Sequence, residues 1–242
     1  FYQMNGAYQT EEGVSFTVSS HGATSCVLLL FRPAAQEPYA RIRIPESYKI
    51  GNTYSILVFG LKAEDFEYAY QMDGPADQAR GLLFNRKHTL LDPYAKAVTG
   101  QRNWGEKPEG GKDFVYKARV VQSDFDWGRY RNLNYKFEDL VIYEMHVRGF
   151  TKDASSGVKG GGTFEGLRQK IPYLKDLGIN AVELMPIFEF DEMESARVVD
   201  GVQLYNYWGY NTVSFFAPNT SYAFHQEHNH EGDELKRLIR EL

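Results

Sequence analysis

The first half of the chain alternates short apolar runs with turn residues, a pattern typical of β-strands. Ala40 to Ile44 alternates apolar and polar positions, so its two arginines share the outer face. Turn residues separate the runs, for example at Ser20-His21-Gly22. The clearest runs cover residues 14–18, 26–31, 40–44, 54–61 and 66–72. Regularly spaced strands with no helical pattern between them predict a small β-sandwich.

After Glu138 the pattern changes to strands that alternate with helices. Segments 140–150, 179–190 and 212–217 are rich in β-branched and aromatic residues, which predicts strands. A polar insert precedes the third segment, and an amphipathic helix is expected at 232–242. This order predicts the start of a parallel α/β fold whose last strand has no neighbouring strand on one side.

A helix is expected between the first two of these strands. Apolar residues recur at helical spacing from Phe164 to Leu177, and Thr163 can cap the helix. Pro172 should kink or restart the helix, and Gly178 should end it as the C′ residue. We assign residues 1–125 to the sandwich with its connector and residues 126–242 to the α/β part.

Aromatic residues are abundant, with 17 Tyr, 16 Phe and 3 Trp among 242 residues. Their flat faces stack on sugar rings, but they also fill protein cores, which accounts for most of them. The net charge of −5, without a Lys/Arg cluster, argues against nucleic acid and anionic membranes as partners. No apolar stretch has membrane-spanning length. The single cysteine, Cys26, excludes an intramolecular disulfide and is expected to be a buried, inert thiol, which fits a cytoplasmic protein.

Two polar motifs suggest ligands, and each also has a structural interpretation. The glycine-rich segment 160–163 precedes a helix, as phosphate-binding loops do, but the dinucleotide pattern needs a glycine where Glu165 stands. We therefore favour a flexible loop between strand and helix. The possible metal ligands are His225, Glu227, His228, His230 and Glu231. Their spacing differs from the two-histidine motif of zinc enzymes, so we predict a solvated loop, with no metal and no cofactor.

Several carboxylates lie on or after the predicted strands of the second half. Acid/base hydrolysis of a glycosidic bond needs two carboxyl groups that face each other across that bond. The candidates are Glu144, Glu183, Glu189, Asp191 and Glu192. The sequence places no pair of them at the required separation, so a structural role is favoured for each. Nucleophilic serine or cysteine chemistry has no local motif to support it.

The segment Tyr205-Asn206-Tyr207-Trp208-Gly209-Tyr210-Asn211, called here the aromatic run, concentrates rings and amides just before a strand. Sugar sites use ring stacking for affinity and amide groups for orientation. Core packing uses the same rings, and the composition alone leaves both interpretations open.

The aromatic run, followed by Phe215-Phe216-Ala217-Pro218, closely resembles isoamylase-type and bacterial glycogen-debranching enzymes of the α-amylase clan. Segment 141–151 looks like the first barrel strand of that group, and segment 178–187 looks like its second. Segment 90–97 is similar to the link between their sandwich and barrel. The resemblance therefore covers almost the whole chain in the right order.

The resemblance implies a glycogen/starch-binding-type β-sandwich followed by the first β/α units of a truncated (β/α)₈ barrel. The family hydrolyses α-1,6 branch points of α-glucans with retention, using two Asp and one Glu on later barrel strands. We expect these catalytic residues beyond Leu242, and an upstream segment before Phe1, so no catalytic residue is assigned here. Tyr210 matches the family tyrosine beside the sugar to be cleaved, with Trp208, Asn206 and Tyr207 as its neighbours in the predicted substrate site.

The expected partner is an α-glucan, and the alternatives stay within carbohydrate biology. The chain could be a non-catalytic α-glucan-binding module, or part of a pullulanase or branching enzyme of the same clan. Preference for branch length and the oligomeric state remain open.

Overall fold

The computed structural model describes residues 4–99, 103–106, 115–122, 124–131, 133–225 and 231–242. The described residues form two compact units. Those of the first unit lie within Phe1–Thr99, Pro108–Gln122 and Ser214–Phe216, and those of the second within Gly100–Lys107, Ser123–Val213 and Ala217–Leu242. Among the helices of these residues, none is long and apolar enough to cross a membrane.

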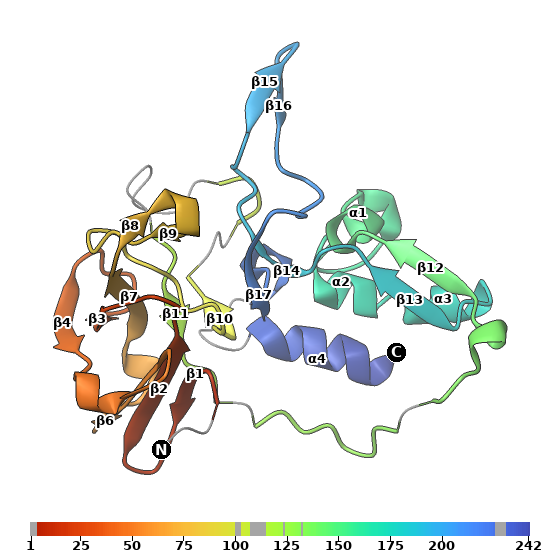
Figure 1. Ribbon diagram of the computed structural model, residues 1–242. Coiled ribbons are helices and arrows are strands. Elements are labelled where there is room, and N and C mark those ends of the chain that lie inside the picture. The colour runs from red at the N-terminus through yellow and green to blue at the C-terminus, as the bar shows by residue number, and fades with distance from the viewer. Residues whose placement is uncertain (1–3, 100–102, 107–114, 123, 132, 226–230) are drawn as a thin grey trace. The chain divides into compact units, whose positions relative to one another are not determined.

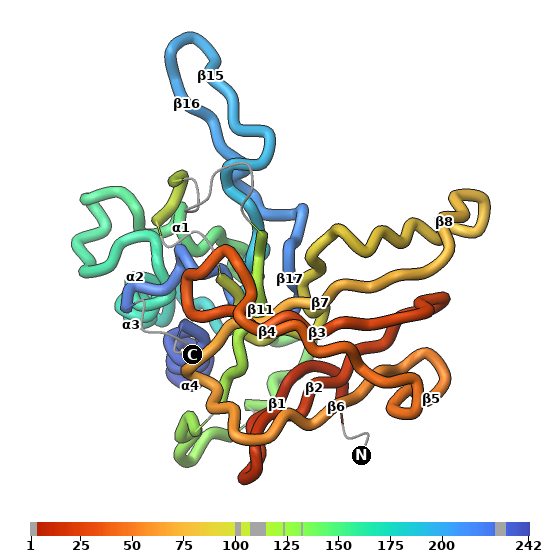
Figure 2. Tube along the Cα trace, turned by 90° about the vertical axis from the view of Figure 1, so that its left-hand side faces the viewer, coloured from red at the N-terminus to blue at the C-terminus, as the bar shows by residue number. Residues whose placement is uncertain are grey.

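The first unit is a β-sandwich of two antiparallel sheets. One sheet has the order β1 (Gly6–Gln9), β2 (Gly13–Ser19), β6 (Thr53–Phe59) and β5 (Lys49–Ile50). The other has the order β10 (Ala97–Val98), β11 (Ala118–Arg119), β7 (Glu67–Asp73), β3 (Ser25–Phe31) and β4 (Pro38–Arg43). A small hairpin, β8 (Ala76–Asp77) with β9 (Leu82–Leu83), follows β7 in the chain. Figure 2 shows β2 and β6 running alongside β3 and β7. The predicted sandwich is confirmed, and each of the five predicted strands is present.

Aromatic side chains from both sheets build the core of the sandwich. Phe16 of β2 meets Tyr68 of β7 edge-on at 5.1 Å between ring centroids, and Phe66 lies 5.9 Å from Phe16. These three side chains are fully buried. Cys26 is also buried, as predicted, and burial raises the pKa of its thiol to about 12. The thiol is therefore neutral and inert at physiological pH.

Two buried polar contacts fix later parts of the chain to the sandwich. The Tyr68 hydroxyl donates to Asp92 Oδ2 at 2.7 Å, which anchors the segment after the small hairpin. Lys117 Nζ lies 2.9 Å from Glu67 Oε2, and both side chains are at most 6% exposed. Burial raises the pKa of Asp92, so the hydrogen bonds from Tyr68 and from the Tyr94 amide only partly offset its loss of hydration.

The second unit contains one parallel strand–helix–strand arrangement. Strand β12 (Ile142–Met145) pairs in parallel with β13 (Ala181–Leu184). The chain between them forms α1 (Val147–Thr151), α2 (Phe164–Arg168) and α3 (Ile171–Asp176), and α4 (Glu231–Glu241) follows later (Figure 1). The predicted change to a parallel α/β pattern is confirmed. The third predicted strand, β17 (Thr212–Pro218), pairs with β14 (Phe188–Phe190) rather than with β13 among the described residues, so a barrel is not evident in this unit.

Two predicted strands are shorter than their apolar patterns suggested. The strand expected over residues 140–150 ends at Met145, because the His146 side chain caps α1 by accepting a hydrogen bond from the Gly149 amide. The strand expected over residues 179–190 is interrupted between β13 and β14, around Pro186, whose nitrogen has no hydrogen to donate to a ladder.

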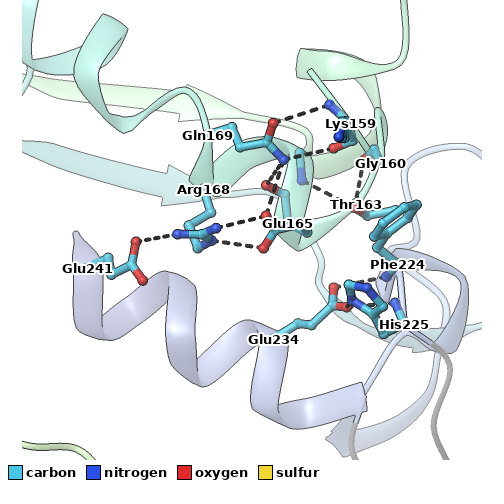
Figure 3. Close-up of polar contacts among 11 residues, drawn as sticks. Lys159, Gly160, Thr163, Glu165, Arg168, Gln169, Phe224, His225, Glu234 and Glu241 are labelled. Atoms are coloured by element: carbon cyan, nitrogen blue, oxygen red, sulfur yellow. Dashed lines mark hydrogen bonds and ion pairs between the residues drawn. The ribbon is translucent and has the colours of Figure 1, made fainter.

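The predicted helix over residues 164–177 is divided into α2 and α3. Thr163 caps α2 through a hydrogen bond from the Gly166 amide, and Pro172 lies in the first turn of α3, where it restarts the helix as predicted. Gly178 follows α3 with φ +86°, the left-handed conformation expected of a C′ glycine. Arg168 binds Glu165 through two hydrogen bonds of 2.8 Å and Glu241 through one of 2.7 Å, which ties α2 to the end of α4 (Figure 3).

The glycine-rich segment 160–163 is a closely packed loop. Gly160 and Gly162 have positive φ, and a Cβ on Gly161 would lie 2.6 Å from the Thr151 carbonyl oxygen. The glycines are thus required by backbone packing, so the segment is a loop as predicted, but it is closely packed rather than flexible.

The polar insert contains a hairpin that its composition did not reveal. Strands β15 (Arg197–Val199) and β16 (Val202–Leu204) pair through a turn at Asp200-Gly201, where both residues have positive φ. In both views the hairpin extends away from the helices of its own unit (Figures 1 and 2).

Candidate functional site

The aromatic run connects β16 to β17, and its two most exposed rings are Trp208 and Tyr210. Trp208 is 53% exposed and Tyr210 is 70% exposed. Gly209 between them has φ +77°, and a Cβ there would lie 2.5 Å from the Phe190 ring. Glycine is therefore required at this position both by the backbone conformation and by close packing. The exposed rings are placed by a backbone that packs directly on the core.

Tyr207 is less exposed, at 36%, because its ring is partly covered by its neighbours. Its ring stacks on the His146 imidazole with centroids 4.2 Å apart and an interplanar angle of 10°. Its hydroxyl lies close to Gly149, where a Cβ would come within 2.5 Å. Trp208 meets both the Tyr207 ring and the His146 ring edge-on, at 5.2 Å and 5.9 Å. Tyr207 thus joins the exposed rings to α1.

His146 is buried and hydrogen-bonded through both ring nitrogens. Its Nδ1 accepts a hydrogen bond from the Gly149 amide at 3.0 Å, and its Nε2 lies 2.8 Å from the Tyr207 carbonyl oxygen. Nε2 is also 3.2 Å from the Tyr222 hydroxyl. Burial lowers the pKa of His146, the nearby Arg148 charge lowers it further, and the hydrogen bond to Tyr207 opposes both. The ring is consequently held as a neutral imidazole.

An inner layer of aromatic rings supports this arrangement. Trp104 stacks on Tyr222 at 6.1 Å with an angle of 6°, and it meets Phe190 and Tyr207 edge-on. The Arg148 guanidinium lies 4.5 Å from the centre of the Trp104 ring. The sequence reasoning did not assign Trp104, His146, Phe190 or Tyr222 to the site, because these residues are far apart in the chain. His146 lies in segment 141–151, which was assigned to a strand.

The asparagines of the aromatic run bind the insert that precedes it. The backbone N–H of Asn206 donates to the Glu192 carbonyl oxygen at 2.9 Å, and the side-chain amide of Asn206 donates to the Asp191 carbonyl oxygen at 3.1 Å. The Asn211 side chain donates to the Glu194 carboxylate at 2.7 and 2.6 Å. The amide groups expected to orient a sugar are used here to close the base of the β15–β16 hairpin. Asn206 therefore supports the shape of the site from behind the rings.

The buried carboxylates of this unit stabilise turns. Glu189 accepts a hydrogen bond from the Thr220 amide at 2.8 Å. Glu192 accepts from the Gly105 amide at 3.0 Å and from the Ser221 hydroxyl. Burial raises the pKa of Glu192, while these two hydrogen bonds lower it. Both side chains are fully buried, which supports the structural roles favoured for them from the sequence.

Glu144 and Glu183 are the carboxylate candidates that the fold places side by side. They are register partners on the parallel strands β12 and β13, so their side chains share one face of the sheet, and both residues are exposed. Asp191, in contrast, accepts a hydrogen bond from the Met193 amide at 2.8 Å and shapes the turn after β14.

The histidine-rich segment gives no metal site in the part of the chain that the structure describes, where no group of three or more potential ligands occurs. Glu227, His228 and His230 lie outside the described residues. The His225 imidazole is 3.1 Å from Glu234, whose carboxylate also accepts from the Phe224 and His225 amides (Figure 3). Glu234 thereby fixes the segment that leads into α4.

Comparison with known families finds a match for most of the sandwich. Residues 4–95 match the family model of carbohydrate-binding module 48, described as the isoamylase N-terminal domain. This range contains the strands from β1 to β9. The sandwich is therefore similar to the N-terminal domain of isoamylases.

The relatedness extends beyond the sandwich to nearly the whole chain. Isoamylase 3 of Oryza sativa subsp. japonica, a chloroplastic protein, is 38% identical over 98% of the chain and 32% of its own length. The glycogen debranching enzyme of Serratia proteamaculans is 32% identical over 90% of the chain and 34% of its own length. The chain spans about a third of the length of these relatives. The chain is therefore similar to the N-terminal portion of isoamylases and glycogen-debranching enzymes.

Solved structures of pullulanases are also similar to nearly the whole chain. A pullulanase of Anoxybacillus sp. LM18-11, crystallised with maltotetraose, superposes with a TM-score of 0.70 at 26% identity. The match covers 98% of this chain and 32% of the pullulanase. Pullulanase type I of Bacillus subtilis, crystallised with maltose, also has a TM-score of 0.70, at 25% identity over 100% of this chain and 32% of the pullulanase.

Proposed function

We propose that the chain is the N-terminal portion of an enzyme that hydrolyses α-1,6 branch points of glycogen- or starch-type α-glucans. The observation that supports the substrate-binding part of this proposal best is the geometry of the aromatic run. Trp208 and Tyr210 are exposed, while the residues around them are packed and hydrogen-bonded. Exposed rings on a rigid base stack on the apolar faces of sugars with little loss of side-chain entropy.

We further propose that residues 126–242 are the first β/α units of a (β/α)₈ barrel, and that residues 1–125 are the binding module with its connector. The parallel pairing of β12 with β13 across a helical crossover supports this division. Among the described residues β12 forms a two-stranded sheet with β13, and parallel strands typically occur in larger sheets whose faces are covered by helices.

No catalytic residue is assigned within this chain. The carboxylates that would attack and protonate the glycosidic bond belong, in this proposal, to a part of the enzyme beyond Leu242. A pullulanase or a branching enzyme of the same clan is the alternative within the enzyme class, because the solved pullulanases share this fold. We place the protein in the cytoplasm, in keeping with its single, buried cysteine.

The binding part is tested by electrophoresis of the purified 242-residue chain through native gels that contain glycogen. Retardation should weaken about fivefold for Trp208→Ala and for Tyr210→Ala, since an aromatic contact contributes about 1 kcal/mol. Phe137→Ala is the matched control, because Phe137 is an 85% exposed ring in the same unit but outside the aromatic run. Equal retardation of all three variants and the parent chain would exclude the aromatic run as the glucan site.

The catalytic part is tested with the same material, free of longer species. Pullulan, glycogen and amylopectin should remain uncut, and release of reducing ends by the 242-residue chain would contradict the assignment of the catalytic residues elsewhere.

The second candidate function is a non-catalytic α-glucan-binding module, favoured by the family match of residues 4–95. In that case glycogen retardation should depend on the sandwich and be unchanged by Trp208→Ala. The exposed sandwich tyrosines Tyr39 and Tyr48 are suitable positions for the corresponding alanine variants.

A further inference from the structure

His146 connects two segments of the second unit that lie 61 residues apart in the chain. Its Nδ1 faces the Gly149 amide at 3.0 Å, and its Nε2 faces the Tyr207 carbonyl oxygen at 2.8 Å. A backbone amide can only donate and a carbonyl oxygen can only accept. Only the neutral imidazole with hydrogen on Nε2 satisfies both partners, so these two contacts define the tautomer.

The same ring also holds the aromatic run by packing. Tyr207 stacks on one face of the imidazole, and Trp208 meets it edge-on. His146 is only 7% exposed, so water is poorly placed to replace either hydrogen bond. The Tyr207 carbonyl immediately precedes Trp208, which means that the Nε2 hydrogen bond constrains the backbone that carries the exposed rings.

We propose that neutral His146 is a positioning residue: it holds the backbone at Tyr207 so that Trp208 and Tyr210 face a glucan, and protonation of its Nδ1 releases this hold. The functional consequence rests on the proposed glucan site. The tautomer and the ordering of the aromatic run do not depend on that site.

Protonation would place an N–H group on Nδ1 opposite the Gly149 N–H, two donors about 3 Å apart. The positive charge of Arg148 in α1 also opposes a second positive charge on His146. The other rings that face the imidazole are Trp104, Tyr207, Trp208 and Tyr222, which are uncharged at neutral pH. The negative charge of the Glu192 carboxylate attracts the Arg148 guanidinium, which reduces the repulsion between Arg148 and a protonated His146.

The sign of the pH effect follows from the lowered pKa of His146. The folded, ordered state binds this proton less readily than a solvated histidine does. Ordering of the aromatic run is therefore fully present above a pH of about 6.5, the ordinary histidine value, and weakens as the pH falls below it.

Nuclear magnetic resonance on the complete chain tests the tautomer and the ordering. Long-range proton–nitrogen spectra should show His146 protonated on Nε2 at pH 7.5 and titrating below the ordinary histidine value of about 6.5. The heteronuclear NOE values of the Trp208 and Gly209 amides should fall as His146 takes up its proton. An Nδ1–H tautomer would overturn the proposal, and so would NOE values that stay constant while His146 takes up its proton.

Two conservative variants separate the two hydrogen bonds. Asparagine can place Oδ1 near the position of Nδ1 and keep the cap on Gly149, but it is too short to reach Tyr207. Glutamine can reach the Tyr207 carbonyl but does not reproduce the cap. We expect His146→Gln to retain the NOE values and His146→Asn to lose them. A change of equal size in both variants would indicate a merely structural role for the ring.

Affinity for maltotetraose, measured by calorimetry at pH 7.5 and 5.5, tests the functional consequence. The parent chain should bind more weakly at pH 5.5, and His146→Gln should bind equally at both values. His146→Asn should lose about fivefold in affinity at pH 7.5, which corresponds to the loss of one net hydrogen bond of about 1 kcal/mol. The control His21→Gln should keep the parent pH dependence, and loss of that dependence in the control would contradict the assignment to His146. If maltotetraose binds at neither pH, the proposed function fails, and the NOE results still decide whether His146 positions the run.

Discussion

Replacing Gly209 by alanine should lower the stability of the second unit for two reasons. The first is backbone strain, because Gly209 has φ +77°, and the left-handed conformation costs an alanine about 1–2 kcal/mol. The second is overpacking, because the added Cβ would lie 2.5 Å from the Phe190 ring, which is fully buried. Forcing a carbon into a packed core costs about 1–3 kcal/mol. Together the two effects should destabilise the second unit by about 2–5 kcal/mol.

Gly178→Ala provides the matched control. Gly178 has φ +86°, close to that of Gly209, but a Cβ there would meet nothing within 4 Å. This variant should therefore show the backbone cost alone, about 1–2 kcal/mol. The difference between the two variants isolates the contact with Phe190.

Urea unfolding followed by tryptophan fluorescence is the suitable assay. All three tryptophans, Trp104, Trp127 and Trp208, belong to the second unit, so the signal reports on that unit. The midpoint of Gly209→Ala should fall clearly below that of Gly178→Ala, and glycogen retardation should weaken only for Gly209→Ala. Equal midpoints would refute the inference that the aromatic run is positioned by direct backbone packing on Phe190.

Three further outcomes follow from the remaining contacts. Cys26 should resist a thiol reagent at pH 8 in the native chain and react rapidly in denaturant, because burial raises the pKa of its thiol to about 12. Rapid labelling of the native chain would contradict the burial of Cys26 in the core. Lys117→Ala should destabilise the sandwich by about 3–5 kcal/mol, since it leaves the Glu67 carboxylate buried without its partner. The double variant Lys117→Met with Glu67→Leu should lose less stability, and unfolding followed by circular dichroism measures both. Arg168→Ala should cost about 1 kcal/mol at low salt and less in 1 M NaCl, because the Arg168 side chain is 29% exposed; an effect independent of salt would argue against the ion-pair network.

The sandwich was largely predictable because its information is local. Period-two alternation located β2 and β4, and a continuous apolar run located β3. Turn residues set the limits of these strands and of β6 and β7, and each of the five has six or seven residues. Most of the strands that were missed, such as β5 and β10, have only two residues, too few for any period to appear.

The second unit was predicted less completely, because tertiary contacts compete there with local preference. Residues 147–151 include valine, phenylalanine and threonine, which favour strands, yet they form α1 once His146 caps it. The insert before the aromatic run appeared merely polar, whereas its Asp200-Gly201 turn and the hydrogen bonds of Asn206 and Asn211 make it a hairpin with a closed base.

The sequence by itself determined the order of the elements, the caps at Thr163 and Gly178, and the family to which the chain is related. It could not distinguish Tyr207 from Tyr210, two tyrosines three positions apart in one motif. The tertiary structure decided this, by stacking Tyr207, which is 36% exposed, on His146 and leaving Tyr210 70% exposed. The physical reason is that the exposure of a ring depends on its partners, and those of Tyr207 come from 61 and about 100 positions away in the chain.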